Sequence, residues 1–360
     1  MGRRQLRHHR RGRWILLEAA LFEDVDENVT TAVLAAMTSV IESLGGKSGR
    51  TCGQQLVDAT AAVLFGWPIG PGDGGVDGLA AVAPDQLAAI IGGRRDVADI
   101  SAELIAVAAL ADGQLDAERV LAALTYASHL GVEASWVADL GDIVEGRLDE
   151  AMQDMVVRNA ATFPGLAEPG DEPRMQPYDG QSDADKRLYA RYQELEGYPP
   201  GSFGRALWVH FRRHGFRFPG QQGAFHEAFA IPHDSLHVLS GYDTSMQGEL
   251  LVSTYTGRMH AQDAFTAHLL PVILQWHIGR EVNGIGAQHG ALDPWKFLVA
   301  WRRGEQTTID VLDPGWHFFD VAREPLIELR SRYGIPELPD RYRPTGPEVN
   351  FTSEADPTVC

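Results

Sequence analysis

Two histidines and a carboxylate in the C-terminal half of the chain have the spacing of a metal site. His233 and His237 are four residues apart, so on a helix both side chains lie on one face and can reach one ion. Glu249 follows after glycines that let the chain turn, so a second helix can present it to the first. Imidazole and carboxylate ligands suit zinc or another divalent ion. We predict a zinc site formed by His233, His237 and Glu249, with a coordination position left open for substrate.

A histidine pair by itself is weak evidence, because the chain holds 13 histidines and a second pair with the same spacing. His210 and His214 lie beside Arg212 and Arg213, and so many cations disfavour a metal site. We interpret this second pair as the solvated surface of a helix that ends at Gly215. The acidic residues at fixed positions are what distinguish the first pair from the second.

Asp234 is the predicted catalytic residue, and three roles are open to it. It can be a fourth ligand, a partner that orients an imidazole, or a proton acceptor. The alternative without function is a favourable charge in the first turn of a helix that starts after Pro232. The residue types and spacing do not decide between these roles.

The elements that must position these residues are predicted to be helices throughout. Apolar residues recur at helical spacing, and alternating β-branched residues are scarce, so we predict an all-α protein of two helical domains joined by a linker rich in proline and glycine. The predicted parts are a basic tail (1–14), a helical domain (15–162), the linker (163–181), a metal-binding helical domain (182–336) and a disordered tail (337–360).

The helices around the motif are expected at about 234–239, 247–258, 262–278, 294–303 and 324–333. The segment from Phe265 to Ile278 is apolar on most of its circumference, so it either lines a lipid pocket or is a buried core helix. Four neighbouring residues have no matching ligand spacing and are interpreted as core or surface residues: His260, Asp263, His268 and His277.

Composition narrows the classes of function. The net charge of −18 argues against a protein that binds nucleic acid with its whole surface. Cys52 and Cys360 do not make a disulfide framework, which favours a reducing, cytoplasmic location. No segment reaches the roughly 18 apolar residues of a membrane span. The arginine-rich start of the chain either contacts anionic lipid or reflects a start codon placed too far upstream.

The motif resembles the signature of a known family. His233-Asp-Ser-Leu-His237, eleven residues and Glu249 are similar to the HDxxH-x11-E signature of the ubiquinone (coenzyme Q) biosynthesis family of the fourth Coq protein. The resemblance extends over about 183–336 and includes four flanking segments: Gly201-Ser-Phe-Gly204-Arg-Ala-Leu, His214-Gly-Phe216, Ala300-Trp-Arg-Arg-Gly304 and Glu324-Pro-Leu-Ile-Glu-Leu-Arg330.

This resemblance implies a helical fold with an apolar cavity for a polyprenyl tail and a metal at its polar end. It implies either a scaffold that organises the enzymes of the pathway or an enzyme that replaces the ring carboxylate of a prenylated benzoate-type quinone precursor by hydroxyl. Such an enzyme would be a metal-dependent lyase or oxidative decarboxylase. The four metal or catalytic positions fall on His233, Asp234, His237 and Glu249. It also implies a peripheral protein at the inner face of the cell membrane that works with other quinone-biosynthesis enzymes, and we expect a homo-oligomer. The many alanine, glycine, aspartate and arginine residues indicate a bacterial source with a high-GC genome.

The N-terminal half has a weaker resemblance to TerB-like tellurite-resistance domains, which are small helical bundles. It is carried by the stretch from Leu104 to Glu118, in which a helical segment is followed by an acidic turn with Asp112, Gly113, Asp116 and Glu118. The full calcium-loop pattern is missing, so an acidic turn with a helix cap is the better interpretation.

Three other functions compete with the first. The fold can serve as a prenyl-lipid-binding scaffold without catalysis. A zinc hydrolase is less favoured, because Asp234 is one methylene shorter than the glutamate of the HExxH motif. A phosphohydrolase of the HD type would need further ligands, for which only His226 and Asp263 can be offered.

Overall fold

A computed structural model describes most of the chain. The described residues are 25–42, 51–73, 75–166, 176–260, 262–281 and 286–346. Within these ranges the regular elements are helices, with isolated bridges but no strand. The predicted all-α class is therefore confirmed. The predicted basic tail (1–14) lies outside the described residues.

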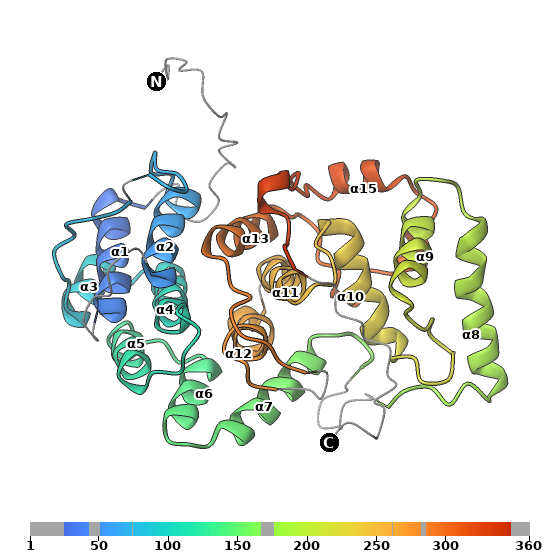
Figure 1. The fold of residues 1–360 in the computed structure, drawn as a ribbon, viewed down its shortest axis with the longest axis horizontal. Helices are drawn as coiled ribbons and strands as arrows, with labels where there is room; N and C mark the ends of the chain where they lie inside the picture. Colours follow the sequence, from blue (N-terminus) through green and yellow to red (C-terminus); the bar gives the residue numbers. More distant parts are fainter. Residues whose placement is uncertain are drawn as a thin grey trace, which may run out of the picture.

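The described N-terminal half is a group of helices around a core of alanine, leucine and valine (Figure 1). Its elements are α1 (Glu27–Glu42), α2 (Cys52–Ala59), the π-helix η1 (Thr60–Leu64), α3 (Pro84–Ile91), α4 (Arg95–Leu110), α5 (Ala117–His129), α6 (Ser135–Val144) and α7 (Leu148–Ala161). Helix α5 starts as predicted, because the Asp116 side chain accepts a hydrogen bond from the backbone N–H of Arg119. Asp112 accepts hydrogen bonds from Gly53 and Arg119, so the acidic turn is held within this half.

The described C-terminal half contains the predicted motif. Its elements are α8 (Asp183–Gln193), the 3-10 helix η2 (Glu194–Gly197), α9 (Phe203–His214), α10 (Glu227–Ser240), α11 (Met246–His260), the π-helix η3 (Ala264–Leu269), α12 (Leu270–Trp276), α13 (Pro294–Gln306), α14 (Phe318–Val321), α15 (Leu326–Arg332) and η4 (Asp340–Tyr342). The single helix expected over 262–278 is therefore two elements, and its first part has π geometry.

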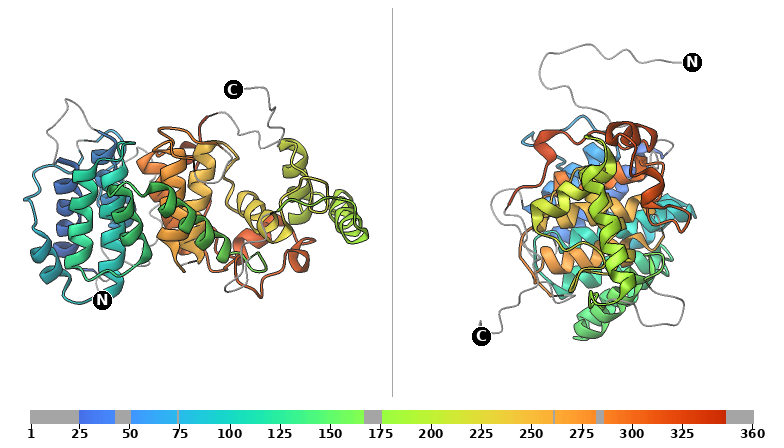
Figure 2. Two further views of the ribbon diagram at one scale, coloured as in Figure 1. Left: turned by 90° about the horizontal axis from the view of Figure 1, so that it is seen from below. Right: turned by 90° about the vertical axis from the view of Figure 1, so that its right-hand side faces the viewer.

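The two halves share one hydrophobic core. Helices α11, α12 and α13 lie between the N-terminal helices and α8 to α10, as Figures 1 and 2 show. Helix α13 packs on α2 and η1, and α7 packs on η3. Polar contacts join the halves as well: Arg258 bonds to Glu103, and the Nε2 atom of His277 lies 2.8 Å from the carbonyl oxygen of Ala111. The two halves of the chain therefore pack directly against each other.

Two predicted boundaries fall in well-packed regions. The linker expected over 163–181 begins with buried side chains, Phe163 and Leu166. The tail expected over 337–360 is not disordered in its first ten residues, because Leu338 and Tyr342 are buried and Thr345 accepts a hydrogen bond from Lys296. That expectation is corrected for 337–346, since apolar residues hidden among prolines anchor this stretch. The rest of the tail lies outside the described residues.

Among the helices that the structure describes, none combines the length and the apolar character needed to cross a lipid bilayer.

Candidate metal centre

Helix α10 carries both histidines of the motif and is longer than predicted. It begins at Glu227, where His226 caps the N–H of Ala228, and it continues through Pro232. Asp234 therefore lies in the middle of the helix and not in its first turn. The interpretation of Asp234 as a helix N-terminal charge is wrong, because the helix does not restart after the proline.

Two arginines hold the C-terminal end of α10. Arg330 donates to the carbonyl oxygens of Val238 and Leu239, at 2.7 and 2.9 Å. Arg303 is buried and donates to the carbonyl oxygen of Ser240 at 2.8 Å. These are carbonyls that a helix end leaves without intrahelical partners, and cations are favoured there. Both arginines belong to the flanking segments of the family resemblance, so those segments fix the helix that carries the histidines.

A tight turn between α10 and α11 brings Glu249 back to the histidines. Gly241 ends α10 with a positive φ of 82°. The Asp243 carboxylate then accepts hydrogen bonds from the N–H of Ser245 at 3.0 Å and from its hydroxyl at 2.6 Å. Gly248 follows with no room for a side chain, because a Cβ atom there would overlap the Asp243 backbone carbonyl. Glu249 thereby enters the first turn of α11 facing α10.

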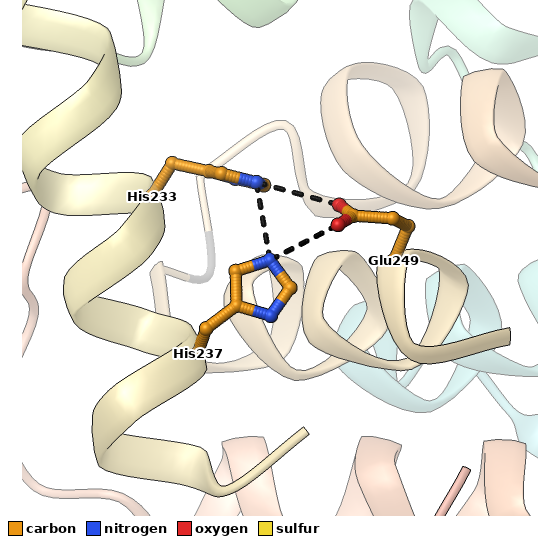
Figure 3. Close-up of side chains that lie close together, drawn as sticks. All are labelled: His233, His237 and Glu249. Carbon is orange, nitrogen blue, oxygen red and sulfur yellow. Dashed lines mark hydrogen bonds and ion pairs between the residues drawn. The ribbon is translucent and has the colours of Figure 1, made fainter. Parts of the chain in front are cut away.

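Three ligand atoms converge on one point, as Figure 3 shows. The Nε2 atoms of His233 and His237 lie 3.2 Å apart. Nε2 of His237 lies 3.3 Å from Oε1 of Glu249, and Nε2 of His233 lies 3.4 Å from Oε2. Ligands about 2.0–2.1 Å from a tetrahedral zinc ion are separated by about 3.3 Å. The three residues therefore have the spacing of a zinc ligand set, and among the described residues they form the one such group.

Neighbouring groups fix both imidazole rings. Nδ1 of His237 lies 3.0 Å from the carbonyl oxygen of Tyr242. A carbonyl only accepts, so Nδ1 carries the proton of this bond and Nε2 is the atom turned toward Glu249. The ring of His233 stacks on Phe229, with centroids 5.2 Å apart. Such support around the ligands is typical of metal sites.

The electrostatics of the group favour a cation. Burial alone would lower the pKa of His237, but the carboxylate of Glu249 raises it to about 9. Burial would raise the pKa of Glu249, but the two imidazoles hold it well below its ordinary value. Glu249 is therefore a buried carboxylate that attracts positive charge. A divalent ion bound at Nε2 of His237 would take the place of the proton there.

Asp234 is the predicted site residue that does not join the group. One helix position after His233, its side chain points to α9, where Oδ1 accepts a hydrogen bond from Nε2 of His210 at 2.8 Å. His210 in turn stacks on the ring of His237, with centroids 5.7 Å apart. Asp234 thus lies beside the three ligand atoms as a charged neighbour.

The interpretation of His210 and His214 as solvated helix surface is wrong. The His210 side chain is 11% exposed and bonded to Asp234. His214 lies 3.2 Å from the hydroxyl of Thr244, in the turn before α11. Helix α9 therefore uses both histidines to contact the motif, while Arg212 and Arg213 face outward. Spacing along one helix could not reveal this, because the contact depends on how α9 packs on α10.

A cavity of about 600 Å³ lies next to the three ligand atoms. His233, Asp234 and Glu249 line it, whereas His237 lies behind them. Most of the remaining lining is apolar, and Phe225, which is 43% exposed, marks its rim. The volume falls within the range of about 300–1,000 Å³ that is usual for small-molecule sites.

Both halves of the chain contribute to the cavity wall. Helix α7 supplies Met155, Val156 and Asn159. The segment over 265–278 was expected to line a pocket or to be a core helix, and it does both. One face lines the cavity, with His268, Pro271, Val272 and Gln275, and the opposite face, with Phe265, Ile273 and Leu274, is buried away from it.

Comparison of the chain with family models, with curated proteins and with solved structures gives no match. The resemblance to the ubiquinone-biosynthesis family and that to TerB-like domains therefore stay predictions. The candidate centre stands on its own geometry.

Proposed function

We propose that this protein binds a divalent ion through His233, His237 and Glu249, and that zinc is the preferred ion. In this proposal the adjoining cavity receives a polyprenylated aromatic quinone precursor, and the site supports replacement of a ring carboxylate by hydroxyl. The observation that carries the proposal is the convergence of three ligand atoms, 3.2–3.4 Å apart, on the wall of a largely apolar cavity.

The arrangement of the ligands supports a site that is open to substrate. His233 and Glu249 line the cavity while His237 lies behind them, so positions left free on an ion would face the cavity. A bound divalent ion would hold the ring carboxylate at the polar end of the cavity. Loss of carbon dioxide leaves the bonding electron pair on the ring carbon, so the hydroxyl that replaces it requires a two-electron oxidant and an oxygen source, for which the proposal takes dioxygen. The protein's own contribution is to hold the carboxylate end of the substrate beside the ligands and to keep the ring among apolar side chains.

Asp234 and His210 supply a proton-handling pair beside the ligands. Their hydrogen bond of 2.8 Å joins a carboxylate that lines the cavity to an imidazole on the neighbouring helix. Such a pair can take up a proton from a group in the cavity, which keeps Asp234 as the proposed catalytic residue. Its bond to His210 favours this role over that of a fourth ligand.

The size of the cavity limits how much of a prenyl chain it can hold. A volume of about 600 Å³ accepts the ring and the first isoprene units, and a longer tail must leave past the rim. Phe225 and Arg217 are exposed at that rim. An aromatic and a cationic side chain there suit contact with an anionic membrane surface, from which a prenylated substrate would enter.

Metal and lipid analysis of the purified full-length protein tests the proposal. We expect about one equivalent of zinc per chain and a co-purifying isoprenoid in organic extracts. His237→Ala should remove the zinc, because the remaining ligands no longer close the site. His129→Ala is the matched control, since His129 lies exposed on α5. Protein that carries neither metal nor isoprenoid would contradict the proposal.

A second measurement separates catalysis from scaffolding. The quinone content of cells that rely on the His237→Ala variant should fall if the ion takes part in turnover. Normal quinone content with a zinc-free variant would mean that the protein binds the lipid without transforming it.

A further inference from the structure

A histidine outside the group of three ligands also lines the cavity. His268 lies on the π-helix η3, lines the cavity and is 3% exposed. It does not belong to the group of three ligands. π-helical turns are rare and occur often at functional sites. This histidine has no role in the proposed metal centre.

Contacts with Asn159 determine which nitrogen of His268 carries the proton. The amide nitrogen of Asn159 donates to the carbonyl oxygen of Ala267 at 2.8 Å, which fixes the orientation of the amide. The same nitrogen lies 3.4 Å from Nδ1 of His268. An amide nitrogen only donates, so Nδ1 must accept and the proton of the neutral ring is on Nε2.

The ring is uncharged at neutral pH. Burial lowers the pKa of His268 to about 3, and the neighbouring His260 acts in the same direction. His260 cannot serve as an acceptor through Nδ1, because that atom already bonds to Asp310 at 2.7 Å. His268 is therefore a neutral donor in an apolar wall.

Nε2 of His268 has no hydrogen-bond partner among the described residues. Buried donors are nearly always paired, so such an atom calls for an explanation. The atom is buried, so the ring must turn toward the cavity before Nε2 can reach a ligand there. The aromatic ring of Phe163 packs against the His268 ring, with centroids 6.3 Å apart. The polar atoms of His268 are the two nitrogens at its edge.

We propose that Nε2–H of His268 donates a hydrogen bond to a carbonyl-type oxygen of the compound that occupies the cavity. An uncharged N–H donor favours a ligand with an oxygen acceptor. It makes no hydrogen bond to an ammonium group, because that group has no acceptor. The inference rests on the proposed function only in that the same cavity receives the ligand, because the hydrogen bond does not involve the metal ligands. It also gives the N-terminal half a part in recognition, since Asn159 on α7 sets the tautomer.

Binding of prodan, a fluorescent naphthyl ketone, to the chelator-treated full-length protein tests the inference. The emission of this probe shifts to the red when its carbonyl accepts a hydrogen bond. We expect red-shifted emission with the natural protein and with His268→Gln, whose amide keeps a donor near the position of Nε2. His268→Leu should bind about three- to tenfold more weakly and emit further to the blue. Dimethylaminonaphthalene, which lacks the ketone, should bind all three alike.

Asn159→Asp provides a test that keeps His268 in place. The carboxylate would accept from Nδ1, so the proton would leave Nε2 and the red shift should disappear. Two-bond proton–nitrogen spectra of protein with isotope-labelled histidine read the tautomer directly, with Nε2–H expected in the natural protein and Nδ1–H in the variant. A natural protein with Nδ1–H overturns the inference, and so does prodan affinity unchanged in His268→Leu.

The outcome is separable from that of the metal proposal. A protein that binds no zinc but shows the prodan contrast keeps this inference and loses the first. A protein that binds zinc and shows no contrast loses this inference alone.

Discussion

The two halves of the molecule bury different kinds of side chain. Among the described residues, five buried polar or charged residues lie in 25–166 and eighteen in 176–346. Helices α1 and α4 bury almost only alanine and aliphatic side chains, whereas α10 and α11 bury serine, threonine, histidine, aspartate and glutamate. Buried polar groups lower stability unless they are paired. Their concentration in the C-terminal half therefore favours this half as the location of a functional site.

The apolar half packs against the half that holds the candidate metal centre. Helix α13 packs on α2 and η1, and Arg258 of α11 bonds to Glu103 of α4. The N-terminal half also supplies part of the cavity wall, through Met155, Val156 and Asn159 of α7. If this division is right, substitutions of the same type should have different consequences in the two halves.

The largest expected effect on stability comes from the apolar half. Leu34 is fully buried in α1, whose main packing partners among the described elements are α2, α3 and α4 of the same half. Leu34→Ala should lower the free energy of unfolding by about 2–5 kcal/mol, because it leaves a cavity. Zinc content per folded chain should stay the same, and Leu121→Ala, at a 51% exposed position of α5, is the control. Loss of zinc from folded Leu34→Ala protein would break the division between the halves.

The next effect comes from one glycine in each half. Gly248→Ala should weaken zinc binding about a hundredfold, because the new Cβ would overlap the Asp243 carbonyl and displace Glu249. Gly141→Ala in α6 meets no atom within 4 Å and should stabilise the protein by about 0.5–1 kcal/mol. Calorimetric zinc titration and thermal unfolding measure the two. Equal zinc affinity in both variants would contradict the proposed role of the turn.

The parts of the site that spacing determines were predictable from the sequence. His233 and His237 share a face because four residues make about one helical turn, and Glu249 returns to them because glycines permit the turn. The helical class follows from periodicity in the same way. The contact of Asp234 with His210 could not be predicted from the sequence. Helical spacing gives the direction of the Asp234 side chain from the helix axis, but it does not tell which helix packs on that side.

What sequence reasoning missed depends on packing between distant segments. Arg303 and Arg330 were recognised as part of flanking segments, but nothing in their spacing indicates that they hold the end of α10. His268 has no partner at ligand spacing, and its Asn159 contact joins residues 109 apart in the chain. The π-helix around it also differs from the ordinary helix that its apolar pattern predicts.

A smaller effect is expected from pH through His268. Its pKa is about 3 when folded and near 6.5 when unfolded, so its share of stability is full above 6.5 and is lost as the pH falls. The titratable neighbours that act on it are His260, Asp310 and His233. Between pH 6.5 and 5 the natural protein should lose about 2 kcal/mol more than His268→Gln. Denaturant unfolding at both pH values measures this, and parallel losses would contradict the buried neutral state.

The smallest expected effect compares two buried aspartates. Asp234→Asn keeps the size of the side chain but removes a negative charge beside the ligands, so zinc affinity should fall about tenfold with little change in stability. Asp139 is the counterpart in the N-terminal half, where it pairs with Arg158 at 2.6 Å. Asp139→Asn should lower stability and leave zinc affinity unchanged, because it weakens a structural ion pair. If Asp234→Asn binds zinc normally but slows quinone formation in cells, the carboxylate acts on the substrate and not on the ion. If Asp234→Asn lowered stability while Asp139→Asn lowered zinc affinity, the polar groups of the C-terminal half would be structural.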